Sequence, residues 1–418
     1  MVGRPVPEKT RFDIARRLSG RFHPLRMISS HLRPEAALPS DHQDAAIVGR
    51  IQLPGSGPTL VQVRADAVYD LSRLAPTCSD LLELPDPAAA VRAHGGERIA
   101  STREVLANSS CDARVEDTPF LLAPCDLQAI KAAGVTFVAS MLERVIEEQA
   151  RGDASKAESV RQAVIAVIGD NLGAVKPGSP EAARLKDILI AQGMWSQYLE
   201  VGIGPDAEVF TKSQPMSAVG TGAEVGIHPG SEWNNPEPEI VLAVSSRGEV
   251  KGAALGNDVN LRDFEGRSAL LLGKAKDNNA SCAIGPFIRL FDARFGIADV
   301  RGCELSMRVE GPDGFVMHGS SVLSKISRDP LDLVGQATGA NHQYPDGFML
   351  FLGTMFAPTQ DRHGPGQGFT HVVGDVVTVA TPRLGTLANR VNTSDRVAPW
   401  TYGTRSLMRD LARRGLLR

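Results

Sequence analysis

The most constraining feature of the chain is an apolar, β-prone segment that carries two glutamates two positions apart. It reads Asn-Pro-Glu-Pro-Glu-Ile-Val-Leu-Ala-Val over residues 235–244. Side chains two positions apart in a strand point to the same face, so Glu237 and Glu239 share one surface. A Ser-Ser-Arg-Gly turn at 245–248 leads into a second strand-like run at 249–256. An antiparallel hairpin over these residues would bring Asp258 back beside both glutamates.

Three carboxylates on one surface repel one another unless a cation or extra protons compensate their charge. A hard divalent cation with oxygen ligands is the usual solution. These runs contain no His or Cys, which argues against zinc. We therefore predict Mg²⁺ as the cofactor, bound by Glu237, Glu239 and Asp258, with Mn²⁺ or Ca²⁺ as alternatives. The competing interpretation is a pair of edge-strand glutamates that face water.

The segments around this hairpin resemble the fumarylacetoacetate hydrolase superfamily. Glu-x-Glu is followed by Asn-Asp-Val-x-x-Arg-Asp at 257–263, then by lysines and a Gly-Pro at 285–286. Three more stretches are similar to family motifs: Phe-Thr-Lys-Ser-Gln-Pro at 210–215, Leu-Gly-Thr at 352–354 and Val-Gly-Asp-Val-Val at 373–377. The resemblance covers roughly residues 130–395. It implies a magnesium or manganese ion on the three acids and, aligned on the Gly-Pro, Lys276 as the catalytic lysine.

The resemblance also implies the fold, an α+β, β-rich structure. We expect a rolled, mixed β-sheet catalytic domain of the fumarylacetoacetate hydrolase type over residues 126–418, with a helical lid insertion near 140–200. A smaller N-terminal domain over residues 46–125 begins with alternating strand patterns around a Gly-Ser-Gly-Pro turn. The arginine-rich residues 1–45 are expected to form an arm, with an organelle-targeting peptide as the alternative. A Gly-Pro-Asp-Gly turn at 311–314 and an amphipathic helix over 405–418 complete the pattern.

The lid is helical by the spacing of its apolar residues. A core-facing stripe recurs at helical positions: Met141, Leu142, Val145 and Ile146. That stripe leaves three charged residues for solvent: Glu147, Glu148 and Arg151. A Ser-Pro-Glu at 179–181 fits the start of a second helix. Because this region is long compared with the short lid of hydrolytic members, we expect it to cover the site.

One departure from the hydrolytic pattern bears on the reaction. Hydrolytic members use a His-x-x-Glu pair on the lid helix to activate water. In this chain Ser140 occupies the histidine position and Glu143 is kept. A lone glutamate can still deliver a proton to a leaving hydroxyl, so the departure favours dehydration over C–C hydrolysis. The alternative for Glu143 is an ordinary solvated position on a helix.

The chain is most similar to the 2-keto-3-deoxypentonate dehydratase branch through residues 234–239 and 276–281. This resemblance implies a Mg-dependent hydro-lyase of pentose catabolism, which dehydrates 2-keto-3-deoxy-D-xylonate or D-arabinonate to 2-oxoglutarate semialdehyde through a metal-stabilised enolate. Lys276 would take a C3 proton, its pKa lowered by the cation and by burial, and Glu143 would help to expel the C4 hydroxyl. Further substrate contacts are expected from Ser140, Lys212, Ser213, Asn278 and Thr354. We expect Arg262 to be structural, paired with Asp263 or Glu265.

Composition limits the remaining function classes. The net charge of −3 over 418 residues gives no bias toward nucleic acid, and no apolar run is long enough for a membrane span. Five scattered cysteines suit a reducing compartment. We therefore expect a cytoplasmic homodimer or homotetramer that acts on a small sugar acid. Two alternatives stay open: an acylpyruvate-type C–C hydrolase on the same scaffold, and a non-catalytic metal-binding protein of this fold.

Overall fold

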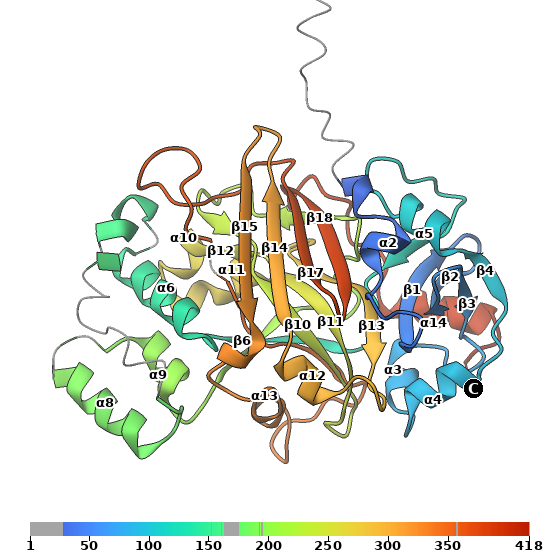
Figure 1. Cartoon of the computed structure of the whole chain (residues 1–418), viewed down its shortest axis with the longest axis horizontal. Coiled ribbons are helices and arrows are strands. Elements are labelled where there is room, and N and C mark those ends of the chain that lie inside the picture. Colours follow the sequence, from blue (N-terminus) through green and yellow to red (C-terminus); the bar gives the residue numbers. More distant parts are fainter. Residues whose placement is uncertain are drawn as a thin grey trace, which may run out of the picture.

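The computed structural model describes residues 28–151, 153–159, 161–162, 175–191, 193, 195–356 and 358–417. A long sheet forms the centre, and a second, shorter sheet lies across one of its faces (Figure 1). The N-terminal strands lie at one end of the long sheet, and helices α6 (Val138–Gln149), α8 (Pro180–Ala191) and α9 (Gln197–Ile203) lie at the other (Figure 1). The expected mixed, strand-rich fold is confirmed.

Strand order places chain segments from both halves of the sequence side by side. The long sheet runs β4 (Arg98–Ser101), β3 (Ala67–Asp70), β2 (Gly57–Val63), β1 (Ile47–Leu53), β13 (Cys282–Leu290), β11 (Val250–Asp258), β10 (Pro238–Val244), β16 (Phe348–Phe351), β6 (Ala129–Gly134) and β7 (Glu208–Ser213), and β5 (Phe120–Leu122) pairs with β1. The second sheet runs β15 (Val316–Val322), β14 (Glu304–Glu310), β17 (Val376–Thr381), β18 (Gly385–Thr393) and β8 (Glu224–Ile227). A short ribbon pairs β9 (Asn234–Asn235) with β12 (Asn260–Leu261).

Strand β10 is buried on both faces, which explains its unbroken apolar run. Ile240 and Leu242 point into the core between the two sheets, whereas Val241 and Ala243 point into a second core on the opposite face. All seven residues of β10 are buried. The strand that carries Glu239 is therefore held from both sides.

The expected hairpin is confirmed. Strands β10 and β11 pair antiparallel with Glu239 opposite Gly256, and the amide of Asp258 donates to the carbonyl of Glu237 over 2.9 Å. Gly248 closes the turn with a φ of 75°, a conformation that glycine adopts without strain. Asp258 thus ends β11 beside the start of β10.

The N-terminal strands continue the central sheet. β1 pairs antiparallel with β13, with Val48 opposite Ile288, and the core on one face of the sheet joins Val48 and Leu60 to Val241. The smaller N-terminal domain that we propose for residues 46–125 therefore shares its sheet with the remainder of the chain. Residues 1–27 of the expected arm lie outside the described residues, and Ile28 and Leu32 are buried against β17 and β18.

The helices cap the sheet ends. Besides α6, α8 and α9, they are α2 (Pro34–Ala37), α3 (Cys78–Leu82), α4 (Pro87–Ala93), α5 (Thr102–Asn108), α10 (Arg262–Glu265), α11 (Leu272–Lys276), α12 (Ile297–Arg301), α13 (Pro330–Ala337) and α14 (Thr404–Arg413), with 3-10 turns at Ile28–Ser30, Ala154–Lys156, Ala269–Leu271 and Leu323–Lys325. Among the described residues, none of the helices has the length and apolar character needed to cross a membrane. The expected C-terminal helix is α14, which packs Leu407 and Leu411 on the body.

Helix α6 corrects one expectation. Met141, Val145 and Ile146 are buried as the spacing predicts, but Glu147, expected in solvent, is only 1% exposed. The reason is that α6 has protein on a second side, where Glu147 meets Arg144 of the same helix and Arg262 of α10. The charged face of this helix is therefore an internal contact.

Candidate metal centre

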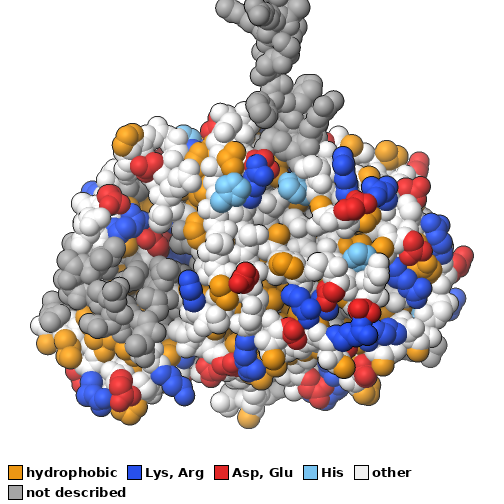
Figure 2. All heavy atoms as spheres, viewed as in Figure 1, with side chains coloured by type: hydrophobic (Ala, Val, Ile, Leu, Met, Phe, Trp, Pro, Cys, Tyr) orange, Lys and Arg blue, Asp and Glu red, His pale blue; other side chains and the backbone are white. Residues whose placement is uncertain are grey.

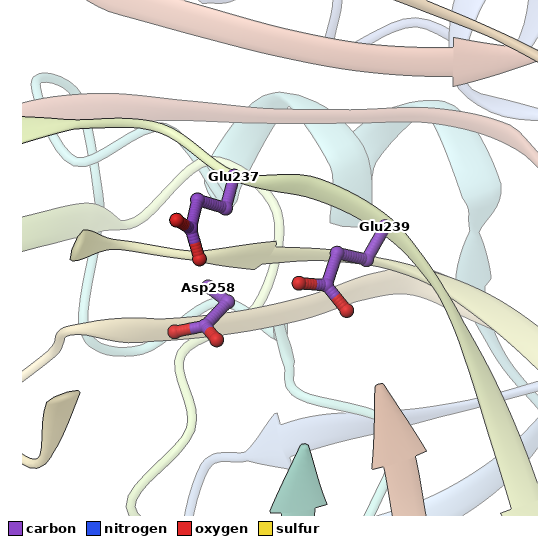
Figure 3. A group of neighbouring side chains, drawn as sticks. All are labelled: Glu237, Glu239 and Asp258. Atoms are coloured by element: carbon purple, nitrogen blue, oxygen red, sulfur yellow. The ribbon is translucent and has the colours of Figure 1, made fainter. Parts of the chain in front are cut away.

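The three predicted metal ligands converge. Glu237 and Glu239 extend from the start of β10, Asp258 extends from the end of β11, and their carboxylates point toward one another (Figure 3). One oxygen from each lies within 4.8 Å of the other two. Each residue is at most 3% exposed, so the edge-strand alternative, with glutamates facing water, does not hold.

Two lysines compensate the charge of this triad. The Nζ of Lys276, at the end of α11, lies 2.6 Å from Oε2 of Glu237 and 3.2 Å from Oδ2 of Asp258. The Nζ of Lys212, in β7, lies 2.8 Å from Oδ1 of Asp258 and donates to the carbonyls of Val259 and Lys276 over 3.1 Å and 2.5 Å. Lys212 has no exposed surface, so its ammonium is committed to orienting Asp258. This placement leaves it no free donor for a substrate.

The two glutamates have opposite pKa shifts. Burial disfavours ionisation of Glu237, but Lys276 and Arg144 outweigh burial and lower its pKa. Burial raises the pKa of Glu239 well above its ordinary value, and the charges of Asp258 and Glu237 raise it further. Of these two carboxyls, Glu239 is therefore the one whose surroundings favour the protonated form.

The surroundings of Lys276 favour its charged form, whereas the expected base needs a neutral amine. Burial works against its ammonium form, but Asp258 and Glu237 prevail and raise its pKa. The lysine acts here as a counter-ion for the two carboxylates. A divalent cation on the same oxygens would take over that role and remove the cause of the raised pKa.

The turn after β16 holds Glu239 in place. The amide of Gly353 donates to Oε2 of Glu239 over 2.7 Å. Gly353 has a φ of 98°, and a Cβ at this position would lie 1.9 Å from Oγ1 of Thr136, so only glycine fits. The Leu-Gly-Thr stretch noted in the sequence thus positions a metal ligand.

Arg144 is the main residue that the sequence did not reveal. Its Nη2 donates to Oε1 of Glu237, and its Nη1 lies 2.6 Å from Glu147 and 3.2 Å from Glu265. Glu147 in turn lies 3.2 Å from Nε of Arg262, which donates to Asn235 over 2.8 Å. Arg262 therefore pairs with Glu147 and Asn235, and not with Asp263 or Glu265 as the sequence led us to expect. No local pattern signals this cluster, because its members come from three separate segments.

The predicted acid Glu143 lies beside Arg161. Its two oxygens accept from Nε and Nη2 of Arg161 over 3.1 Å and 2.8 Å, and its side chain is 13% exposed. The structure brings Glu143 onto the same helix as Arg144 but into no recorded contact with the triad. The side chain of Ser140 lies outside the described residues.

The other predicted substrate contacts are engaged locally. The amide of Asn278 donates to the carbonyl of Lys274 over 2.8 Å, and Oγ1 of Thr354 donates to the carbonyl of Phe356 over 3.0 Å. Ser213 shares a hydrogen bond with Ser217. Thr354 directly follows Gly353 and so lies near Glu239, whereas Asn278 closes the turn after α11. Their substrate roles remain predictions.

A cavity of about 230 Å³ adjoins this region. Trp233 and Arg262 form one wall, Arg161 of the lid forms another, and the loop from Pro358 to Phe369 closes it. Among the described residues, the indole nitrogen of Trp233 is buried without a hydrogen-bond partner. The three triad carboxylates are not among the residues that line this cavity.

Sequence comparison agrees with this architecture. Residues 196–392 match the model of the fumarylacetoacetate hydrolase C-terminal domain. All three triad residues and both lysines lie inside the matched range. The family resemblance inferred from the motifs is confirmed.

Two curated relatives share the same enzyme class in their names. A probable 2-keto-3-deoxyxylonate dehydratase of Haloferax volcanii is 32% identical over 200 residues, which are 48% of this chain and 65% of the relative. A 2-dehydro-3-deoxy-D-arabinonate dehydratase of Saccharolobus solfataricus is 28% identical over 184 residues, 44% of this chain and 58% of the relative. The chain thus spans less than two thirds of the length of either protein.

Solved structures show the same fold. A 2-keto-3-deoxy-D-arabinonate dehydratase complexed with magnesium and 2,5-dioxopentanoate matches 83% of this chain and 99% of its own, with a TM-score of 0.57 and 19% sequence identity. Its apo form gives a TM-score of 0.58 over the same shares of both chains. At this identity the likeness establishes the fold.

Proposed function

We propose that this protein is a Mg²⁺-dependent hydro-lyase that converts 2-keto-3-deoxy-D-pentonate, the D-xylonate or D-arabinonate derivative, to 2-oxoglutarate semialdehyde. The observation that carries the proposal is the buried triad of Glu237, Glu239 and Asp258 with the Lys276 amine against two of its members. The names of both curated relatives, and the magnesium with which a structural neighbour is complexed, support the same reaction class and cofactor.

The donor set fits a hard divalent cation. All three ligand candidates are carboxylates, their oxygens are close enough to share one ion, and they are shielded from water. Burial, and after it the charges of Asp258 and Glu237, raise the pKa of Glu239, and a cation bound to its oxygens would oppose both effects. When bound, Mg²⁺ would supply Lewis-acid polarisation of a 2-oxo acid. Mn²⁺ is the alternative ion.

Charge balance supports an anionic substrate. The buried charged groups around the triad include four cations, Arg144, Lys212, Arg262 and Lys276, and five carboxylates, Glu147, Glu237, Glu239, Asp258 and Glu265. With Glu239 protonated, these described groups are neutral overall. A divalent cation that displaces the Glu239 proton leaves one positive charge in excess as long as Lys276 is still protonated. The carboxylate of a sugar acid would neutralise that charge.

The residues of the chain divide the proton transfers between them. Lys276 would take a proton from C3 once it no longer serves as the counter-ion of Glu237 and Asp258. Glu143 would deliver a proton to the departing C4 hydroxyl, with Arg161 holding its orientation. A second proton shift, from C5, would then yield the aldehyde. Lys212 and the Gly353 amide would keep Asp258 and Glu239 in place throughout. Ser213, Asn278 and Thr354 are the proposed contacts for substrate oxygens.

A product assay tests this proposal. The purified protein, with and without Mg²⁺, is incubated with both C4 epimers of 2-keto-3-deoxypentonate, and the semialdehyde is quantified. Metal-dependent semialdehyde formation is the expected result. Release of pyruvate from acylpyruvates would instead identify a C–C hydrolase, and Mg²⁺ binding without C3 exchange of pyruvate in D₂O would identify a non-catalytic protein. We also propose a cytoplasmic homodimer or homotetramer as the working form.

A further inference from the structure

We propose that Arg144 is a positioning residue for the metal ligand Glu237, and that it makes the metal affinity of the site depend on lid helix α6. This inference rests on the metal-binding part of the proposed function. The inference goes beyond the proposed function because it assigns a role to a lid residue that touches no reacting atom.

The two oxygens of Glu237 are held by cations from different parts of the chain. Oε1 accepts from Nη2 of Arg144, in α6, and Oε2 accepts from Nζ of Lys276, at the end of α11. Lys276 also lies against Asp258, so it stands among the groups that a metal ion would bind. Arg144 holds the other oxygen of Glu237, and among the described residues its further ion pairs are with Glu147 and Glu265, not with Asp258 or Glu239. An ion can therefore replace Lys276 at Oε2 while Arg144 keeps Oε1.

Arg144 is itself fixed from two helices. Its Nη1 lies 2.6 Å from Glu147, one turn further along α6, and 3.2 Å from Glu265 at the end of α10. The guanidinium side chain is 9% exposed, and Glu147 and Glu265 are buried with it. A planar fork held at both ends has little rotational freedom. Through its hydrogen bond to Oε1, the guanidinium also restricts the orientation of the Glu237 carboxylate.

A competing effect must be weighed against this role. A cation beside a metal ligand repels the metal ion, so on charge alone the removal of Arg144 would strengthen binding. The charge of Arg144 is, however, partly offset by Glu147 and Glu265, and Arg262 also lies 3.2 Å from Glu147. Removal of Arg144 would add some attraction for the metal ion, but it would also free Glu237 to turn toward other partners, and we expect the loss of orientation to dominate. Loss of a partner that orients a metal ligand typically costs 10- to 100-fold in metal affinity.

The test is the dissociation constant of Mn²⁺, measured by calorimetry on the full-length protein. Arg144→Met should weaken Mn²⁺ binding by about 10- to 100-fold. Arg144→Lys, which keeps a charge but cannot span three carboxylates, should restore part of the loss. Arg328→Met is the matched control, because Arg328 is equally buried but donates to backbone carbonyls of Val201 and Gly204. The control should bind Mn²⁺ as the unmodified protein does.

The outcomes separate this inference from the proposed function. If the unmodified protein does not bind Mn²⁺, the proposed function fails first. If it binds Mn²⁺ and Arg144→Met binds equally well or more tightly, the role of Arg144 is refuted. Should that variant not fold, hydrogen exchange of the unmodified protein gives the answer: saturating Mg²⁺ should slow exchange of the α6 amides relative to those of α13. Unchanged α6 exchange would overturn the coupling.

Discussion

Replacement of Glu239 by Gln separates the metal-free protein from the metal-bound one. In the metal-free site Glu239 is 1% exposed, has a strongly raised pKa and accepts one hydrogen bond from Gly353 over 2.7 Å. Gln has the shape of the protonated acid and can accept the same hydrogen bond. We therefore expect the free energy of unfolding without metal to change by less than about 1 kcal/mol.

The metal-bound state should respond strongly to the same change. Two unit charges 4 Å apart attract by about 4 kcal/mol at an effective dielectric constant of 20, and a divalent ion doubles that figure. Part of this attraction is offset, because Glu239 must first release its proton. A loss of half of the attraction, about 4 kcal/mol, corresponds to an affinity about 10³-fold weaker.

Thermal unfolding with increasing Mg²⁺ measures both states in one experiment. At one hundred times its dissociation constant, Mg²⁺ should stabilise the unmodified protein by about 2.7 kcal/mol, and the variant should show no shift at that concentration. Glu249→Gln, half-exposed in the turn of the same hairpin, is the control and should keep the full shift. A Glu239→Gln protein that keeps the Mg²⁺-induced stabilisation, or that is several kcal/mol less stable without metal, would refute the ligand assignment.

Three further predictions address the catalytic and electrostatic roles. Lys276→Ala should stop exchange of the C3 protons of pyruvate in D₂O, measured by NMR; persistent exchange would mean that another group is the base. Glu143→Gln should slow semialdehyde formation more than C3 exchange, and an equal loss in both assays would remove its separate role. Burial, with a contribution from Glu265, raises the pKa of Glu208 to about 7. The higher pKa in the folded state means that protonation of Glu208 stabilises the fold. This stabilisation is complete below the unfolded pKa of about 4.5 and is lost as the pH rises through 7, and the free energy of unfolding falls by up to about 3 kcal/mol over this range. Glu208→Gln cannot ionise, so the melting temperature of the variant minus that of the unmodified protein should be larger at pH 8 than at pH 5. A difference in melting temperature that does not change with pH would contradict the raised pKa of Glu208.

The sequence was sufficient for features that depend on neighbouring residues. The alternation of β10, the glycine turn and the length of β11 determine that Glu237, Glu239 and Asp258 meet, because strand geometry fixes where each side chain points. The turn at 311–314 between β14 and β15 was foreseen for the same reason. Family motifs added the likeness of fold, which the comparisons confirm.

Features that depend on distant partners could not be read in this way. Helical spacing assigned Glu147 to solvent, since nothing local indicates that Arg144 and Arg262 bury it in an ion-pair network. Likewise, alternation at residues 47–71 predicts strands but not that β1 extends the central sheet through β13. The protonation of Lys276 depends on whether Asp258 and Glu237 or a metal ion provides the nearest charge, which no sequence pattern contains.

Charge is mixed on the face that Figure 2 shows. Basic and acidic side chains are interspersed there, and the coloured part of the chain carries no continuous basic stripe on this face.

The double burial of β10 has a consequence for how this scaffold can be adapted. A substitution in that strand disturbs packing on both of its faces, so few substitutions should be tolerated next to the carboxylates of Glu237 and Glu239. The walls around Trp233, from Arg161 and the glycine-rich loop before Phe369, carry no such double constraint. Substitutions that reshape this cavity should therefore be tolerated more readily than substitutions in the hairpin.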